Sequence, residues 1–251
     1  MPDVPDPLPP PAVPPGLYDE RYYRTACAGF AAWGDDTVDP LYAGMLALAG
    51  FRAGEVLVDI GTGRGELLAV ALEQGAARAI GVEYSPDALE LARRSGGELL
   101  LADARAIPLE DGLADLVTLL DVAEHLAPPE LERTLDEARR LLRPGGRLLV
   151  HTFPTRTYYE VTYRLLRAGR RSWPRDPRND WERAMHVNEL TARGLRRVLA
   201  ARFGDVRVWP GPMTHVGVLP SERARRIVQA LAARPGARRL CAADLFALAR
   251  P

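Results

Sequence analysis

Residues 56–68, VLVDIGTGRGELL, decide the fold of this chain. Their first five residues form a short apolar run around Asp59, which is typical of a parallel strand buried on both faces. Gly61, Gly63 and Gly65 follow at every second position, where they permit backbone dihedrals closed to other residues and let a ligand approach the main chain. The helix expected next offers free N–H groups to an anionic group. The stretch therefore predicts a strand, a tight turn and a helix that together bind a carboxylated or phosphorylated ligand.

Three further acidic residues follow predicted strands. Glu83, Asp103 and Asp121 come directly after apolar segments that we expect as the second, third and fourth strands. A carboxylate such as Glu83 can accept from both hydroxyls of a ribose, and one such as Asp103 can accept from an exocyclic amine like that of adenine. Because ligands of parallel sheets bind at the carboxyl ends of the strands, these acids and Asp59 should share one edge. That edge suits a cation.

The glycine turn differs from the fingerprint of nicotinamide-dependent enzymes. That fingerprint has the spacing G-x-G-x-x-G, but the residue three after Gly63 is Glu66, so the turn here is G-x-G-x-G. A nicotinamide oxidoreductase therefore stays a weaker alternative, disfavoured by Glu66 and by the series of acids at the strand ends.

Taken together, these segments resemble the class I S-adenosyl-L-methionine-dependent methyltransferases. The resemblance covers residues 55–153 and is carried by VDIGTGRGELL, GVEYSPDALELAR, LADARAIPLEDGLADLV, DVAEHL and LLRPGGRLLV, in the family order and spacing. It extends more loosely to residues 188–209 and 242–248, as the last helix and two strands. The resemblance implies an α/β, doubly wound fold with a seven-stranded, mostly parallel sheet. This is the Rossmann-like methyltransferase fold, here with cap insertions.

The resemblance also implies the contacts of the methyl donor, S-adenosyl-L-methionine. Its methionine part is expected near the glycine turn, its ribose on Glu83, and its adenine between Asp103 and Ala104 with Tyr84 against the ring face. Asp121 is expected near the methionine amine. The implied cofactor-binding residues are Asp59, Gly61, Gly63, Gly65, Glu83, Tyr84, Asp103, Ala104 and Asp121.

The composition limits the class of protein. All 33 basic residues are arginine, and they balance 33 acidic residues to a net charge of zero, which argues against a nonspecific nucleic-acid or membrane binder. The chain has no apolar run of about 18 residues, and its first residues, MPDVPDPLPP, look like neither a signal peptide nor a transit peptide. We therefore expect a cytoplasmic protein with no membrane partner, and nucleic acid is disfavoured as a partner.

Proline and loop lengths predict the domain organisation. Residues 1–16 are rich in proline and predict a disordered tail before a single domain over residues 17–251. Two connections, at about 154–187 and 211–241, exceed the roughly twelve residues usual in compact domains, so we expect them to be lids over the ligand edge. An amphipathic stretch at residues 221–233 favours a core-covering helix or a homodimer contact over a membrane anchor.

The first insertion interleaves aromatic and arginine side chains. This combination suits a small-molecule acceptor with flat or apolar parts and an anionic group, although a solvated arginine face explains the same pattern. The candidate substrate-binding residues are Tyr158, Arg170 and Arg171 in the insertion, His186 at its end, and Tyr22 in a helix predicted over residues 18–33.

The predicted catalytic residues are His125 and Glu124, which follow the fourth strand nearest to the expected position of the donor methyl group. A sulfonium methyl group is already activated, so the chemistry needs in-line positioning, exclusion of water, and a base only when the nucleophile carries a proton of high pKa. A structural role for this E-H pair remains an alternative. His151 lies inside a predicted strand and is expected to be a core residue.

A metal-assisted reaction is a further alternative. Asp121, Glu124 and His125 form a D-x-x-E-H cluster, and His186 precedes a helix expected to pack nearby. The cluster resembles the metal sites of small-RNA 2′-O-methyltransferases and of some quinone-pathway O-methyltransferases, where mixed oxygen and imidazole ligands hold a divalent ion. Those sites begin with glutamate rather than the shorter aspartate, so the site expected here holds no metal.

The sequence thus predicts methyl transfer from S-adenosyl-L-methionine to a small-molecule acceptor, with oxygen preferred over nitrogen or carbon. Two alternatives remain at this point. One is a non-catalytic accessory protein that binds S-adenosyl-L-methionine, and the other is a metal-assisted O-methyltransferase of a quinone-type or RNA acceptor.

Overall fold

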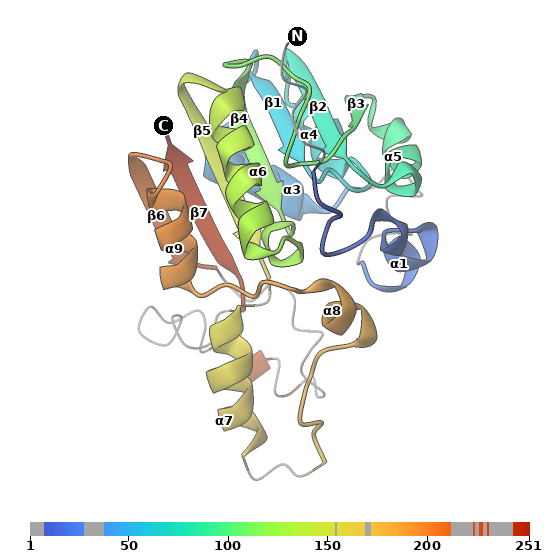
Figure 1. The fold of residues 1–251 in the computed structure, drawn as a ribbon, viewed down its shortest axis with the longest axis vertical. Helices are drawn as coiled ribbons and strands as arrows, with labels where there is room; N and C mark the ends of the chain where they lie inside the picture. Colours follow the sequence, from blue (N-terminus) through green and yellow to red (C-terminus); the bar gives the residue numbers. More distant parts are fainter. Residues whose placement is uncertain are drawn as a thin grey trace.

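The computed structural model describes residues 8–27, 38–153, 155–168, 172–211, 223, 226, 227, 230 and 243–251. Within them, seven strands form one sheet in the order β3-β2-β1-β4-β5-β7-β6 (Figure 1). The strands are β1 (Val56–Ile60), β2 (Arg78–Glu83), β3 (Glu98–Leu101), β4 (Ala114–Leu120), β5 (Leu142–Thr152), β6 (Asp205–Pro210) and β7 (Leu245–Arg250). Only β7 runs antiparallel to its neighbours, β5 and β6. The predicted doubly wound, mostly parallel α/β fold is confirmed.

Helices cover both faces of this sheet. The described α-helices are α1 (Glu20–Thr25), α3 (Pro40–Ala49), α4 (Glu66–Glu73), α5 (Pro86–Ala92), α6 (Pro128–Leu141), α7 (Arg164–Arg167), α8 (Asp180–Met185) and α9 (Ala192–Ala200). Leu46 of α3 and Leu67 of α4 belong to one buried apolar cluster. Leu135 of α6 and Leu199 of α9 belong to another.

The strand β1 divides its side chains between these two clusters. Leu57 packs with α3 and α4, whereas Val58 and Ile60 pack with α6 and α9, so the strand is buried on both faces as its apolar sequence predicts. The parallel register pairs Ile60 with Val82 and so ends β1 and β2 at the same edge. The sheet therefore brings the acids that follow these strands together.

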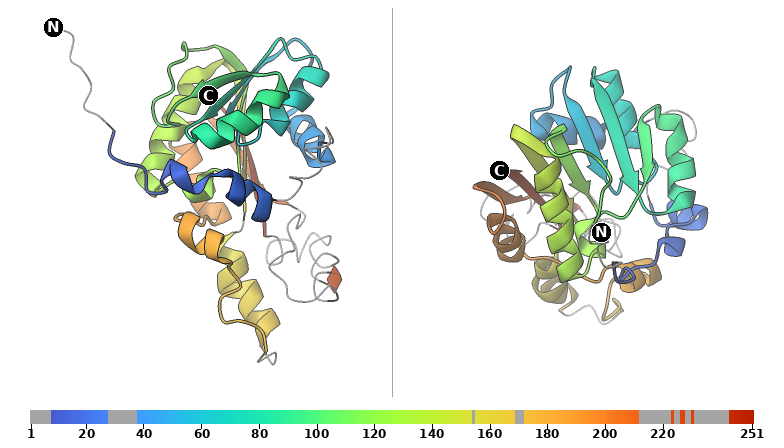
Figure 2. Two further views of the ribbon diagram at one scale, coloured as in Figure 1. Left: turned by 90° about the vertical axis from the view of Figure 1, so that its right-hand side faces the viewer. Right: turned by 45° about the horizontal axis from the view of Figure 1, so that its top comes forward.

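The N-terminal segment differs from the predicted tail. Residues 1–7 lie outside the described part of the chain, but residues 8–16 lie against the domain, and Figure 2 shows this segment and α1 crossing the end of the sheet. Val13 is only 2% exposed, and the Ala12 N–H donates to Glu130 Oε1 at 2.9 Å. Because proline fixes φ in the unfolded chain too, a proline-rich segment loses less conformational entropy when it packs. The proline content is therefore compatible with the contacts that Ala12 and Val13 make with the domain.

The helix predicted over residues 18–33 is shorter in the structure. It begins at Glu20, where the Asp19 carboxylate caps it by accepting from the N–H of Tyr22, and ends at Thr25. Residues 28–37 lie outside the described residues.

The first insertion extends beyond the carboxyl ends of the strands (Figure 1). A π-helix at Tyr158–Tyr163 continues into α7, and α8 then returns toward the sheet. The Asn179 side chain and Glu182 cap the start of α8 reciprocally. Most of the second insertion lies outside the described residues, including most of the amphipathic stretch at 221–233. None of the helices in the described ranges is long and apolar enough to cross a membrane.

Candidate active site

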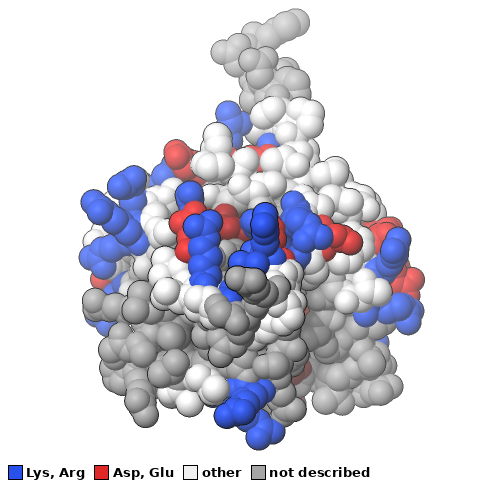
Figure 3. Space-filling model, turned by 90° about the horizontal axis from the view of Figure 1, so that it is seen from below, with Lys and Arg blue, Asp and Glu red and all other residues white. Residues whose placement is uncertain are grey.

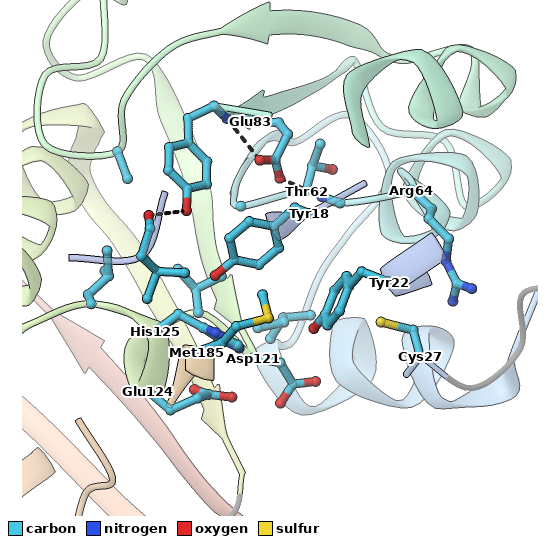
Figure 4. A pocket seen from close by; sticks show the side chains of 18 of the residues that line it. Tyr18, Tyr22, Cys27, Thr62, Arg64, Glu83, Asp121, Glu124, His125 and Met185 are labelled. Atoms are coloured by element: carbon cyan, nitrogen blue, oxygen red, sulfur yellow. Dashed lines mark hydrogen bonds between the residues drawn. The ribbon is translucent and has the colours of Figure 1, made fainter. Parts of the chain in front are cut away.

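A cavity of about 330 Å³ lies at the carboxyl ends of β1, β2 and β4 (Figure 4). One wall is formed by the glycine turn after β1 and by residues at the ends of β2, β3 and β4. The opposite wall is formed by Tyr18 and Tyr22 from the N-terminal segment and by Trp181 and His186 from α8 and the residue after it. We refer to these as the donor wall and the acceptor wall. The cavity thus lies at the edge that the strand-end acids predict.

The glycine turn has the backbone that its sequence predicts. Gly61, Gly63 and Gly65 have φ values of 76°, 54° and 81°, in the left-handed region where side chains are disfavoured. A Cβ atom on Gly61 would lie 2.4 Å from Cγ2 of Val122. Gly65 does not line the cavity but caps α4, where a Cβ atom would lie 3.1 Å from Ala92. The third glycine therefore serves helix packing rather than ligand contact.

Glu83 holds the donor wall together. Its Oε1 accepts from the N–H groups of Tyr84 and Ser85, both at 2.9 Å, and its Oε2 accepts from the Gly63 N–H at 3.1 Å. Burial raises the pKa of this carboxyl, although the three N–H donors favour the charged form. Tyr84 lines the same wall, and its hydroxyl donates to the Val13 carbonyl at 2.9 Å. Glu83 thus connects the glycine turn to the turn after β2.

Asp59 and Asp103 are already engaged with protein groups. The Thr118 hydroxyl donates to Asp59 Oδ1 at 2.6 Å, and burial raises the pKa of Asp59 to about 6. Both Asp103 oxygens accept from the Arg105 guanidinium, at 2.9 and 2.7 Å. This pairing outweighs burial and lowers the pKa of Asp103. Asp103 and Ala104 both line the cavity, so an adenine amine would share the Asp103 carboxylate with Arg105.

Asp121 has an unusual backbone for its residue type. Its φ is 55°, and it is the one non-glycine residue with positive φ in the described part of the chain. Its N–H donates to the His151 carbonyl at 3.0 Å, and its carboxylate lies 2.8 Å from Nδ1 of His151. The Asp121 side chain is 47% exposed and lines the cavity, whereas His151 is fully buried. His151 is therefore a core residue, as predicted, and its ring also contacts Asp121, which lines the cavity.

Aromatic side chains make the acceptor wall. The Tyr22 ring lies edge-on to Tyr18 and to Trp181, with both centroid separations 5.4 Å. Tyr18 also lies 5.7 Å from the His125 ring, and Figure 4 shows its side chain projecting between Glu83 and His125. Tyr22 was a candidate substrate-binding residue, whereas Tyr18 and Trp181 were not. The aromatic content of the two segments is the sequence signal that could have indicated Tyr18 and Trp181. It could not show that these segments, which lie far apart in the chain, contact each other.

Glu124 and His125 lie next to each other on a 3-10 turn at the end of the cavity, and both are buried. Glu124 Oε2 accepts from the Thr152 hydroxyl at 2.8 Å. Burial and the nearby Asp121 carboxylate raise the pKa of Glu124 to about 8. Burial and His186 lower the pKa of His125 to about 3, even though its ring hydrogen-bonds the backbone of Met185.

His125 and His186 complete a possible ligand set with Glu124. The two imidazole rings lie 4.9 Å apart between centroids, and Nδ1 of each ring is buried without a hydrogen-bond partner among the described residues. One ligand atom from each of Glu124, His125 and His186 lies within 4.8 Å of the others. Asp121, the first member of the sequence cluster, is not part of this group.

The remaining candidate substrate-binding residues lie elsewhere. Tyr158 does not line the cavity; it is fully buried in the insertion beside Tyr159, with ring centroids 5.7 Å apart. Its expected role is therefore corrected to packing within the insertion, because its ring is fully buried there. Arg170 and Arg171 lie outside the described residues.

The arginines of the cavity are paired. Arg64 is buried and its guanidinium lies 2.6 Å from Glu66 Oε1, while Arg105 contacts Asp103 and Glu130. These are the two arginines among the described lining residues. The acids that line the same cavity are Asp39, Asp59, Glu66, Glu83, Asp103, Asp121, Glu124, Glu130 and Glu182. The cavity is therefore an acidic environment.

Comparison with known proteins identifies this arrangement. Residues 58–150 match a family model described as a methyltransferase domain. A demethylmenaquinone methyltransferase of Thermus thermophilus is 36% identical over 110 residues, which are 41% of this chain and 49% of that protein. A tRNA (carboxymethyluridine(34)-5-O)-methyltransferase of Mus musculus is 30% identical over 114 residues, which are 45% of this chain and 17% of that protein. The chain thus spans less than half the length of either relative.

The fold agrees with that match. A S-adenosylmethionine-dependent methyltransferase of Archaeoglobus fulgidus superimposes with a TM-score of 0.60 at 20% identity, covering 84% of this chain and 93% of that one. The matched residues, 58–150, include the glycine turn, Glu83, Asp103 and Asp121, which form the donor wall. Residues 58–150 therefore form a methyltransferase domain, and the chain has the fold of S-adenosylmethionine-dependent methyltransferases, with S-adenosyl-L-methionine as the cofactor.

Proposed function

We propose that this chain transfers the methyl group of S-adenosyl-L-methionine to a hydroxyl oxygen of a small-molecule acceptor. The observation that carries the proposal is the single cavity whose donor wall faces a wall of aromatic and imidazole side chains. In the reaction the oxygen–methyl bond forms as the sulfur–methyl bond breaks, and S-adenosylhomocysteine leaves. Because the methyl group is already activated, the main tasks of the protein are to align the oxygen and to exclude water.

The acidity of the cavity bears on the acceptor. A cationic sulfonium donor is stabilised by the surrounding carboxylates, whereas an anionic group deep in the same cavity would be repelled. Aromatic edges and faces at Tyr22 and Trp181 favour a flat, uncharged part of the acceptor there. We infer that the reacting end of the acceptor is neutral.

An anionic end of the acceptor would fit better in a second hollow. Arg156, Arg164, Arg175 and Arg178 line this hollow beside the cavity, and His186 lines both. Figure 3 looks at the molecule from below and shows basic and acidic side chains interspersed on that face. Arg178 is paired with Asp176 and Glu189, so its charge is partly neutralised. The arginines of this hollow therefore support an anionic acceptor less strongly than the acidic cavity supports a neutral reacting end.

The acceptor hydroxyl must lose a proton. A general base works best when its pKa lies near the working pH; burial and Asp121 raise the pKa of Glu124 toward that range, whereas burial and His186 lower the pKa of His125 away from it, and Glu124 lines the cavity. His125 is nevertheless neutral at pH 7, with an Nδ1 that has no partner among the described residues. We therefore assign Glu124 as the proton acceptor and His125 as the residue that orients the hydroxyl.

The test is release of S-adenosylhomocysteine by the purified chain with a panel of phenols, quinols and aliphatic alcohols, detected by mass spectrometry. Glu124→Gln should lower kcat by about 100-fold or more with little change in donor affinity, the size expected for loss of a general base. Glu98→Gln, at an exposed ion pair with Arg78, is the matched control and should keep full activity. Donor binding without any S-adenosylhomocysteine would instead favour the non-catalytic accessory protein.

A second candidate function is metal-assisted O-methylation, and the cluster of Glu124, His125 and His186 favours it. Ligand atoms around a tetrahedral divalent ion lie about 3.4 Å apart at bond lengths near 2.1 Å, so a spread of up to 4.8 Å requires these side chains to draw closer together when an ion binds. The unpartnered Nδ1 atoms are the donors that such an ion prefers. These three residues would hold the ion, which would lower the pKa of a bound acceptor hydroxyl.

Metal dependence separates the two candidates. Zinc or manganese should bind the chain in calorimetry, His186→Asn should abolish that binding, and chelator should remove activity if the ion is needed. Full turnover after exhaustive treatment with chelator would leave Glu124 as the base. The relatives named above act on a quinone and on a tRNA, so a quinol and a short RNA belong in the same acceptor panel.

A further inference from the structure

The buried end of the site contains a histidine between two carboxylates. His151 lies on strand β5 and is fully buried, with Nδ1 2.8 Å from Asp121 Oδ1 and Nε2 3.8 Å from Asp244 Oδ2; both are charge contacts, because neither nitrogen meets hydrogen-bond geometry. Asp121 follows β4, and Asp244, also fully buried, immediately precedes β7. The row Asp121–His151–Asp244 therefore crosses three strands of the sheet and ends at the cavity.

The surroundings of His151 make this row electrostatically strong. The Phe246 ring lies 4.6 Å from the imidazole between centroids, so one side of the ring has an apolar neighbour. The charged groups that interact with His151 among the described residues are Asp121, Asp244 and, more remotely, Glu124. Burial disfavours a charged imidazole, but the two nearer carboxylates overcome this and raise the pKa of His151 to about 10. Because the His151 ring is fully buried, its ion pair with the half-exposed Asp121 is screened less by water and salt than a surface pair.

Asp121 needs such support because its backbone is unfavourable. A non-glycine residue at φ of 55° is strained and persists only where neighbouring groups hold it. His151 holds it twice, since its carbonyl accepts from the Asp121 N–H at 3.0 Å and its ring contacts the carboxylate. The same side chain remains 47% exposed, so its carboxylate is also available at the cavity.

We propose that His151 is a positioning residue for the methyl donor: with Asp244 behind it, its ring holds the Asp121 carboxylate where the ammonium group of S-adenosyl-L-methionine binds. This proposal rests on the donor site of the proposed function. It concerns the amino-acid end of the donor alone, because the row contacts neither Glu83 nor Asp103, which face the expected ribose and adenine. Asp244 has an indirect role, in that its carboxylate keeps the ring charged and oriented toward Asp121.

The experiment compares the whole donor with a fragment that lacks its amino-acid end and its sulfonium charge. Calorimetry measures the binding of S-adenosyl-L-methionine and of 5′-methylthioadenosine to the parent chain and to His151→Asn. The variant should bind S-adenosyl-L-methionine about tenfold more weakly or worse, as expected for a lost charge-assisted contact, while its affinity for methylthioadenosine stays within about twofold. Asp121→Asn should show the same selective loss, and the double variant should lose no more than either single one, because the two residues act as a unit.

The matched control is Asp115→Asn, at the opposite end of β4 from Asp121. Asp115 is buried, accepts from the Val56 N–H at 2.9 Å and pairs with Arg143, so its loss should lower the melting temperature without changing either affinity. Equal weakening of both ligands in His151→Asn, or no weakening of either, would overturn the proposal. If His151→Asn does not fold, Asp244→Asn takes its place and should show a smaller loss confined to S-adenosyl-L-methionine; unchanged binding there would equally overturn it. A parent chain that binds neither ligand would refute the donor site itself.

Discussion

The two walls of the cavity are built in different ways. The donor wall consists of residues that follow β1, β2, β3 and β4, so the sheet register sets their positions, and Glu83 joins two of these turns by accepting from three backbone N–H groups. The acceptor wall is assembled from segments far apart in the chain, through side-chain contacts such as that between Tyr22 and Trp181. Sheet hydrogen bonding fixes the first wall, whereas packing of short helices fixes the second. The two walls meet at Tyr18, whose ring lies edge-on to Tyr84 at 5.5 Å between centroids and whose carbonyl accepts from the Ser85 hydroxyl at 2.9 Å.

The largest effect is expected at Gly61, in the glycine turn of the donor wall. Gly61→Ala should abolish detectable binding of S-adenosyl-L-methionine in calorimetry. The new Cβ atom would lie 2.4 Å from Cγ2 of Val122, in a backbone at φ of 76° that alanine disfavours, so the turn must move. Such a shift displaces the backbone of the turn, which lines the cavity.

Gly54→Ala is the control for that prediction. Gly54 also has positive φ, 85°, but a Cβ atom there would meet nothing within 4 Å. This variant should lose roughly 1 kcal/mol of folding stability and keep its donor affinity. If both variants bind the donor equally well, the turn is not the donor site.

The next effect separates the ribose contact from general damage to the wall. Glu83→Ala should weaken S-adenosyl-L-methionine binding by roughly 10- to 100-fold, since hydrogen bonds to a charged group contribute about 1.5–3 kcal/mol. A part of the loss should be structural, because the carboxylate also holds the Gly63 N–H at 3.1 Å. Glu83→Gln keeps one acceptor oxygen and should lose less. Equal affinity of the parent and the alanine variant would exclude Glu83 as the ribose ligand.

The difference between the walls also explains what the sequence could predict. The strand, the glycine turn and the acids Asp59, Glu83 and Asp121 were predictable, because a short local pattern specifies each and a parallel sheet brings their ends to one edge. The contact between Tyr22 and Trp181 was not, since it depends on how α1 and α8 pack. Packing between remote segments has no local sequence signature.

Two other features needed the structure for related reasons. Residues 8–16 have the composition of a disordered tail, but Val13 finds a buried site and Tyr84 a partner carbonyl, which composition cannot reveal. His151 was recognisable as a strand residue, yet its place beside Asp121 and Asp244 depends on the register of β5 and β7. Sequence reasoning thus predicted the donor wall well and the acceptor wall only as a set of candidates.

A smaller effect is expected at the acceptor wall. Trp181→Ala should raise the acceptor KM by about 2- to 10-fold, the range expected for loss of an aromatic contact of about 0.5–1.5 kcal/mol, and leave the donor affinity unchanged. Trp173→Ala is the control, because Trp173 stacks on Tyr163 in the same insertion at 6.0 Å between centroids and does not line the cavity. A change in donor affinity in Trp181→Ala, with the acceptor KM unchanged, would mean that the two walls have been assigned the wrong way round.

The smallest effects concern stability and pH, where the histidines of the two regions should act in opposite directions. His151, beneath the donor wall, has its pKa raised to about 10 by Asp121 and Asp244 in spite of burial. Its contribution to stability is therefore fully present below about 6.5, the pKa in the unfolded chain, and is lost as pH rises toward 10. Burial lowers the pKa values of His125 and His186 to about 3 and about 4. Their contribution is present above about 6.5 and is lost as pH falls toward 3.

Thermal unfolding of the donor-free chain with chelator present, followed at pH 4 to 10, tests both pH dependences. The melting temperature of the parent should exceed that of His151→Asn by several degrees at pH 6, since about 1 kcal/mol shifts it by roughly 2–4 °C in a domain of this size, and the gap should narrow by pH 10. The stability that Glu124 and Asp59 contribute also falls as pH rises, toward about 8 and about 6. The quantity to follow is therefore the difference in melting temperature between parent and variant rather than either curve alone. For His125→Asn the gap should instead narrow as pH falls from 6.5 to 4. A gap for His151→Asn that stays constant from pH 6 to 10 would mean that the buried ring is uncharged, and that Asp121 is held by the backbone contact alone.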